Sequence, residues 1–413
     1  MTDRPTLSPS TRALESVNFF MADVQAGIGP FLGVFLQAQG WHPRAIGAVM
    51  TLGGLVGMLA TAPAGALVDA TSHKRMLVAV GSVLTVLASA LLLMSSSVWV
   101  VSLSQVSTAV AGAALGPALA GITLGMVRKA GFDRQFGRNQ AINHAGNVVG
   151  ASLSGVLGWK FGFIAIVGLS ALFAVLAIIS VLLIRQDAID HDAARGLEKR
   201  DTDRHQASGL HVLLTCKPLL ILALALLLFH LGNAAMLPLY GMAVVAAHQG
   251  NPALFTALTI VVAQAVMVMM SILAIRWMRS HGHWFVILLT FLALPVRGLV
   301  AASFIAGWGV WPVQALDGVG AGLQSVAVPA MVAQLLQGTG RVNVGQGALM
   351  TMQGIGAALS PLLGGWVAEA FGFRASFLLL GTISLGSLAL WCVFRSSLRS
   401  TGDDPIANPS VAS

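Results

Sequence analysis

Charged side chains are scarce in this sequence. Asp, Glu, Lys and Arg make up 9% of the 413 residues, whereas 56% of the residues are hydrophobic. A soluble domain usually carries about 25% charged residues. So few charges exclude a soluble fold, because most of the chain must be buried in hydrocarbon. We therefore predict an integral membrane protein.

Cysteine and tyrosine are nearly absent. Cys216 and Cys392 lie far apart in the sequence and suggest no disulfide or metal framework built on cysteine. Tyr240 is the one tyrosine, so aromatic residues at the membrane surface must come mainly from the nine tryptophans. The sequence also lacks a nucleophile–base–orienter arrangement, a Walker-type glycine loop and a soluble domain large enough to hydrolyse ATP. We therefore expect neither an enzyme nor a primary pump, and no cofactor or metal site.

Apolar runs of about 20 residues, each long enough to cross a bilayer, divide the chain. We place spans near 14–37, 45–69, 76–95, 98–127, 138–159, 162–184, 218–246, 252–275, 284–305, 309–336, 343–368 and 373–394. They predict an N-terminal six-helix bundle (1–184) and a C-terminal six-helix bundle with a short tail (218–413). A polar linker (185–217), which we expect to be partly helical, joins them and holds six basic and six acidic residues.

Basic residues are distributed unequally between the two sides of the predicted membrane. Nineteen of the 23 Lys and Arg residues lie in the termini, the linker and the gaps on the same side. Three lie in the opposite gaps (Arg44, Lys160 and Arg374), and Arg297 lies inside a span. By the positive-inside rule, both termini and the linker face the cytoplasm of a bacterial-type inner membrane. Residues 1–13 do not resemble a cleavable signal, and basic residues in short gaps do not indicate nucleic acid, despite a net charge of +8.

The two halves repeat one another. "GASLSGVLG" (150–158) matches "GAALSPLLG" (356–364), and "FGF" recurs at 161–163 and 371–373. At the front of each half, Pro30 in the first span aligns with Pro238 in the seventh, and the offsets of all these matches run between 206 and 210 residues. An even number of spans per repeat gives two halves of the same orientation, related by an axis along the membrane normal.

Twelve spans, a 6+6 repeat and a cytoplasmic linker resemble the major facilitator superfamily of secondary transporters. The gap between spans 2 and 3 reads "GALVDATSHKR" (65–75), similar to that family's G-x-L-x-D-R-x-G-R-K motif. Gly65, Asp69, Lys74 and Arg75 match it, whereas the residues at 70, 72 and 73 depart from it. The resemblance implies an all-α integral membrane fold with twelve transmembrane helices in two six-helix bundles around a cavity. It also implies that the four matching residues gate the cytoplasmic side, Gly65 by allowing close helix approach; the alternative is a basic loop with a capping Asp69.

The sequence matches the signatures of drug antiporters within that family only in part. Gln105 stands in span 4 where proton antiporters often carry an Arg, and "SPLLGG" (360–365) in span 11 is similar to a drug-antiporter element. The direction of transport therefore stays open.

Asp23 lies inside span 1, between Asn18 and Gln25. A carboxylate at membrane depth costs several kcal/mol unless it is protonated, paired or facing water. Asp23 therefore either exchanges protons or binds substrate in a cavity, or it holds polar residues of a neighbouring helix. Asn143, His144 and Asn147 on span 5 are at a similar depth and are the partners expected in the second case.

The second half carries further buried polar groups. His230 and Asn233 lie beside Gly232 and Pro238, a composition that predicts a bend and often marks a binding region. His230 is equally well interpreted as a proton carrier or as a hydrogen-bonded structural histidine. Several glutamines add neutral donors and acceptors of the kind a solute site needs, at Gln264, Gln314, Gln324, Gln346 and Gln353.

Arg297 and Asp317 are each eight residues, or about 12 Å, from the same end of two consecutive antiparallel spans. Equal depth predicts an ion pair, which we expect to be structural rather than directly coupling. The candidates for binding or proton coupling are Asn18, Asp23, Gln25, His144, His230, Asn233, Gln314, Asp317 and Gln353.

We expect a monomeric, proton-coupled secondary transporter in the lipid bilayer, exporting amphipathic or weakly polar small molecules by alternating access. The alternatives are an importer of a specific polar metabolite, an exporter of a metal chelate or metalloid compound, and a non-transporting receptor. The receptor is disfavoured because the linker and the tail are short.

Overall fold

The computed structural model describes residues 9–26, 28–195, 216–249, 251–336 and 342–399. Within these ranges every regular element is a helix, as predicted. The first half contains α1 (Pro9–Ala26), α2 (Gly29–Ala38), α3 (Pro43–Ala70), α4 (Lys74–Ala90), η1 (Leu91–Leu93), α5 (Val98–Ala113), α6 (Leu115–Phe161), α7 (Phe163–Leu183), η2 (Gln186–Ala188) and η3 (Ala193–Arg195). The second half contains α9 (Lys217–Asn233), α10 (Met236–Ala246), α11 (Pro252–Ser303), η4 (Gly307–Gly309), α12 (Val310–Leu335), α13 (Val342–Phe371), α14 (Phe373–Val393) and α15 (Arg395–Arg399).

The helices account for the twelve predicted spans. Ten helical segments of the described residues are long and apolar enough to cross a membrane. One of them, α11, is broken at Gly282 (φ 80°) and supplies two spans. The helix α6 is broken at Arg128 (φ 54°), and its second part supplies the remaining span. The sequence placed most boundaries within a few residues of the observed ones.

Chain contacts group the residues into two compact units. The first contains residues 1–39, 52–204 and 251–258, and the second contains 40–51, 205–250 and 259–413. The start of α3 groups with the second unit, and the start of α11 groups with the first.

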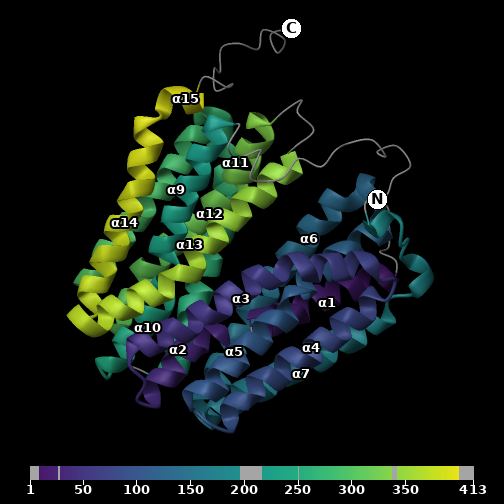
Figure 1. The fold of residues 1–413 in the computed structure, drawn as a ribbon, viewed down its shortest axis with the longest axis horizontal. Helices are drawn as coiled ribbons and strands as arrows, with labels where there is room; N and C mark the ends of the chain where they lie inside the picture. Colours follow the sequence, from purple (N-terminus) through teal and green to yellow (C-terminus); the bar gives the residue numbers. More distant parts are fainter. Residues whose placement is uncertain (1–8, 27, 196–215, 250, 337–341, 400–413) are drawn as a thin grey trace, which may run out of the picture. The chain divides into compact units, whose positions relative to one another are not determined.

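In the first unit, α1 packs against α6 and α7. Leu14, Val17, Met21 and Val24 recur at helical spacing on α1 and are fully buried in the apolar core. In the second unit, α9 packs against α13 and α14 (Figure 1). Gly232 on α9 lies directly against the backbone of α14 at Leu380, since a residue without a side chain lets two helices approach closely.

The internal repeat is visible in the backbone. Gly162 (φ 76°) links α6 to α7, and Gly372 (φ 86°) links α13 to α14 in the same way. Span 1 divides into α1, which ends four residues before Pro30, and α2; span 7 divides into α9, which ends five residues before Pro238, and α10. Proline lacks an N–H and clashes with the carbonyl four residues earlier, so both breaks have a local cause.

The start of the linker packs on the first unit and is partly helical, as expected. The N–H of Asp190 donates to the carbonyl of Gly125 on α6 (3.0 Å), and the Arg128 guanidinium pairs with the Asp190 carboxylate (3.1 Å). The N–H of Ala193, helped by that of Asp192 and by the charge of Arg128, holds the pKa of Asp190 below its usual range.

Candidate functional site

A cavity of about 320 Å³ lies in the second unit between α9, α12 and α13. Its polar lining consists of six uncharged side chains, those of His230, Asn233, Gln324, Ser325, Gln346 and Gln353. The remaining wall is apolar, with Phe229, Leu349 and Met350 among its members. No Asp, Glu, Lys or Arg of the described residues lines this cavity. The sequence named most of these polar residues, but it did not show that they meet.

Hydrogen bonds orient part of this lining. The amide nitrogen of Gln324 lies 2.8 Å from Nε2 of His230, and Gln346 donates to the carbonyl of Pro329 (3.0 Å). The Gln353 amide makes no hydrogen bond with the described residues. Gln346, Leu349, Met350 and Gln353 share a face of α13 because they recur every three or four residues. Gln353 therefore lines the cavity beside Gln346, Leu349 and Met350.

The cavity ends at the break in span 7. Asn233 is the last residue of α9, and α10 begins at Met236, which confirms the predicted bend. The N–H of Ala235, freed by the break, donates to the hydroxyl of Ser360 on α13 (2.9 Å). The break thus leaves Asn233 on the cavity wall, while the backbone N–H of Ala235, two residues later, keeps a hydrogen-bond partner.

Arg297 occupies the centre of a buried polar cluster and is 1% exposed. Its Nη1 donates to Asp317 Oδ1 (2.7 Å) and to Asn233 Oδ1 (2.6 Å), and its Nη2 donates to Gln314 Oε1 (3.3 Å). The ion pair expected between Arg297 and Asp317 is therefore present. We did not predict from the sequence that Asn233 and Gln314 complete the cluster. The signal for Gln314 was its spacing, because Gln314 and Asp317 are three residues apart on α12 and share a face.

Asp23 is 7% exposed and lies against α6 and α7 within the first unit. The hydroxyl of Ser170 on α7 donates to Asp23 Oδ2 (2.7 Å), and Gly150 on α6 lies directly against the carboxylate. No basic side chain among the described residues lies within 4 Å of it. The expected neighbour, span 5, contacts Asp23 through Gly150, but the hydrogen-bond donor is on span 6.

The other polar candidates of the first unit do not join Asp23. Asn18 donates to the carbonyl of Leu14 (2.9 Å), and Asn143 donates to the carbonyl of Asn18 (3.1 Å). Asn147 donates to Asn143 (3.2 Å). Gln25 is exposed, and His144 is half-buried. The hydrogen bond from Asn143 to Asn18 links α6 to α1, and it is separate from the hydrogen bond between Ser170 and Asp23.

The basic residues of the 65–75 motif bind helix ends. Lys74 is 1% exposed, and its ammonium donates to the carbonyls of Val68 (2.6 Å) and Thr71 (2.9 Å) at the end of α3. Arg75 donates to the carbonyls of Leu182 (3.3 Å) and Ile184 at the end of α7. A cation is favourable at these carbonyl-rich ends.

The acidic and glycine positions of the motif behave differently. Asp69 is exposed and forms no ion pair with the described residues. A Cβ at Gly65 would meet no atom within 4 Å. The gating role expected of the motif therefore stays a prediction.

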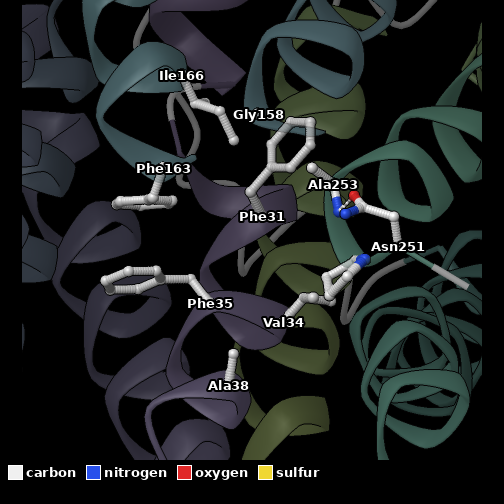
Figure 2. Close-up of a pocket in the computed structure, with 10 residues that line it drawn as sticks. Phe31, Val34, Phe35, Ala38, Gly158, Phe163, Ile166, Asn251 and Ala253 are labelled. Atoms are coloured by element: carbon white, nitrogen blue, oxygen red, sulfur yellow. Dashed lines mark hydrogen bonds between the residues drawn. The ribbon is translucent and has the colours of Figure 1, made fainter. Parts of the chain in front are cut away.

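A second cavity, of about 190 Å³, lies in the first unit between α2, α6, α7 and the start of α11. Figure 2 shows its apolar lining, with the rings of Phe35 and Phe163 face to face at a centroid distance of 3.7 Å. Asn251 is its polar residue, and the side-chain oxygen of Asn251 already accepts the N–H groups of Ala253 (3.0 Å) and Leu254 (3.2 Å). This cavity offers fewer free polar groups than the one around Gln353.

Comparisons with known proteins identify the fold and its relatives. The family model described as Major Facilitator Superfamily matches residues 15–343 and 297–410. Two relatives from Mycobacterium tuberculosis are named uncharacterized MFS-type transporters, MT2531 in strain CDC 1551 / Oshkosh and Rv2456c in strain ATCC 25618 / H37Rv. Each is 37% identical over 384 residues, covering 92% of this chain and 92% of the relative.

Solved structures show the same fold at low sequence identity. The nucleoside transporter NupG superposes with a TM-score of 0.74 and 14% identity, covering 94% of this chain and 99% of its own. A bacterial homolog of the human lysosomal transporter Spinster, in an inward-facing and unoccupied conformation, superposes with a TM-score of 0.72 and 14% identity. That match covers 97% of this chain and 99% of the homolog.

Proposed function

Because the chain belongs to the major facilitator superfamily and is a membrane-embedded secondary transporter of that type, we propose that it exports amphipathic or weakly polar small molecules in exchange for protons. The observation that supports this choice of solute is the uncharged polar lining of the cavity between α9, α12 and α13.

The lining favours a neutral solute with both polar and apolar surface. A buried polar group must find hydrogen bonds, and amide side chains such as Gln353 both donate and accept them. The apolar wall around Phe229 and Leu349 buries the rest of the molecule. A charged solute would lose its hydration without gaining an opposite charge, so it is disfavoured.

We assign proton exchange to Asp23. If ionised, its carboxylate has a neutral hydroxyl donor, that of Ser170, and no cation within 4 Å among the described residues. A lone charge at this depth costs several kcal/mol, whereas binding a proton removes that cost. Such a group can load and release a proton as water access changes during the transport cycle.

We further propose a bacterial inner-membrane location with both termini and the linker in the cytoplasm, and a monomer as the working unit. Nineteen of the 23 basic residues lie on the side assigned to the cytoplasm.

A second candidate is import of one specific polar metabolite. The density of amide groups supports it, since Gln324, Gln346 and Gln353 all line one cavity. A site built on several hydrogen bonds discriminates strongly between similar polar solutes. The two candidates differ in the proton gradient that drives accumulation.

The test uses purified protein in proteoliposomes and a solute chosen by thermal-shift screening of neutral, anionic and cationic compounds. Antiport predicts accumulation when the lumen is acidic, and import by symport predicts accumulation when the outside is acidic. Asp23→Asn should abolish accumulation against a gradient while solute–solute exchange continues, because the carboxyl that carries the proton is gone. Unchanged accumulation would contradict the role of Asp23.

Asp187→Asn is the matched control. It makes the same chemical change at an exposed carboxylate, paired with Arg185 in the linker. Accumulation should be unchanged in this variant.

A further inference from the structure

The Arg297 cluster and the cavity share one face of α12. Gln314, Asp317, Ala321 and Gln324 recur every three or four residues and therefore point the same way. Ala321 and Gln324 line the cavity, whereas Gln314 and Asp317 bind Arg297. Asp317 is four residues from Ala321, or about 6 Å along the helix. The cluster therefore adjoins the cavity.

Asn233 belongs to both. It lines the cavity, and its side-chain oxygen accepts a hydrogen bond from Arg297 (2.6 Å). Only the amide side chain of Asn233 therefore separates Arg297 from a bound solute, so the solute is close to any change of charge at Arg297 or Asp317.

The cluster is neutral because its two charges cancel. Arg297 and Asp317 pair at 2.7 Å, and Asn233 and Gln314 carry no charge. Away from bulk water, an uncancelled charge acts over several ångströms with little screening. We infer that the net charge of this cluster sets the charge of the solute that the cavity accepts, and that Asp317 is the residue that excludes anions by neutralising Arg297.

The cluster has more hydrogen-bond donors than hydrogen-bond acceptors. Nε of Arg297 and Nε2 of Gln314 are buried and have no hydrogen-bond partner among the described residues. If Asp317 lost its charge, Arg297 would be left with a positive charge and a spare donor. That combination binds a carboxylate.

The inference rests on the proposed function in taking the cavity as the solute site. Its test uses three probes of nearly identical shape and different charge: benzamide (neutral), benzoate (−1) and benzamidinium (+1). Binding to the purified full-length protein is measured by isothermal titration. The wild type should bind benzamide at least about tenfold more tightly than either ion, since neither ion finds an opposite charge.

Two near-isosteric substitutions change the net charge of the cluster in opposite directions. Asp317→Asn leaves a net +1 and should reverse the preference to benzoate, by about tenfold or more. Asn233→Asp leaves a net −1 and should reverse it to benzamidinium. The second variant keeps the ion pair intact, so it tests the inference even if Asp317→Asn does not fold.

The double variant Arg297→Gln with Asp317→Asn is the matched control, because it returns the cluster to neutrality and should restore the preference for benzamide. A wild type without that preference, or variants that keep the wild-type order, would overturn the inference. In that case, intact accumulation in proteoliposomes would leave the proposed transport function standing. Absent accumulation by the wild type would instead overturn the transport proposal itself.

Discussion

At the scale of single residues, Arg297 shows what a buried charge requires in this protein. Its guanidinium is 1% exposed and depends on Asp317 for charge neutralisation. Arg297→Ala should lower the free energy of unfolding by about 3–5 kcal/mol, because it strands the Asp317 carboxylate in a buried site. Adding Asp317→Ala should recover part of the loss. Chemical unfolding of the detergent-solubilised variants measures both effects.

Arg374→Ala provides the control for this cycle. Arg374 is exposed and donates to the carbonyl of Ala302 (2.9 Å), so its loss strands no buried charge. It should cost about 1 kcal/mol or less. If the Arg297–Asp317 double variant were as unstable as the sum of the single variants, the pair would not be energetically coupled.

Residue-scale predictions succeeded where a contact depends on depth alone. Arg297 and Asp317 were paired from their equal distance to the ends of adjacent spans, which can be counted in a sequence. Ser170 as the donor to Asp23, and Asn233 as the link between cluster and cavity, also depend on helix rotation and neighbour identity. We did not predict that Lys74 caps a helix. Its long side chain turns back to bind carbonyls three and six residues earlier, and the spacing of residues in the sequence does not show such a contact.

At the scale of elements, the repeated FGF turns are testable. Gly162 and Gly372 each join two spans at a positive φ, which side chains rarely adopt. Their ψ angles (−173° and 162°) place them in a region that is essentially restricted to glycine, so Gly162→Ala and Gly372→Ala should each destabilise the protein by about 1–3 kcal/mol. Thermal unfolding in detergent would show a lower midpoint for both.

Gly168→Ala is the matched control for the turn variants. Gly168 lies inside α7, and a Cβ there would meet no atom within 4 Å. Alanine favours a helix interior, so this change should be neutral or stabilising. A similar loss at all three positions would mean that the positive φ is not the cause.

Most elements were predictable because their signals are local. Apolar length gave the spans, and Gly232 with Pro238 gave the break between α9 and α10. The break of α6 at Arg128 was placed only as a gap, because an arginine at φ 54° has no sequence signature. The docking of Asp190 on Gly125 was not foreseen, since it joins segments more than sixty residues apart.

At the scale of the whole molecule, apolar run length predicted twelve spans and the internal repeat divided them into two sets of six; the helices of the described residues and the family assignment agree with the twelve spans. The grouping of residues 40–51 with the second unit and 251–258 with the first was not predicted. Such grouping depends on packing between segments distant in the chain, which no local pattern encodes.

The orientation of the molecule in the membrane is the last prediction. Arg75 at the start of α4 binds the end of α7, so the gap before α4 lies at the linker end of the first unit. The gap before α5 is on the opposite side, one span away. Ser72 and Ser97 are exposed in these two gaps and suit cysteine labelling, once the free cysteines Cys216 and Cys392 are replaced by serine.

In intact cells, a membrane-impermeant maleimide should label Ser97→Cys at once and Ser72→Cys only after permeabilisation. The physical reason is that basic residues resist translocation, and Lys74 and Arg75 lie two and three residues after Ser72. Ser97→Cys, with Val98 and Trp99 after it, has no such neighbour. The reverse labelling pattern would place the linker outside the cell. The basic residues would then have failed as a guide to orientation, and the acidic side needed to drive export would have to be reassigned.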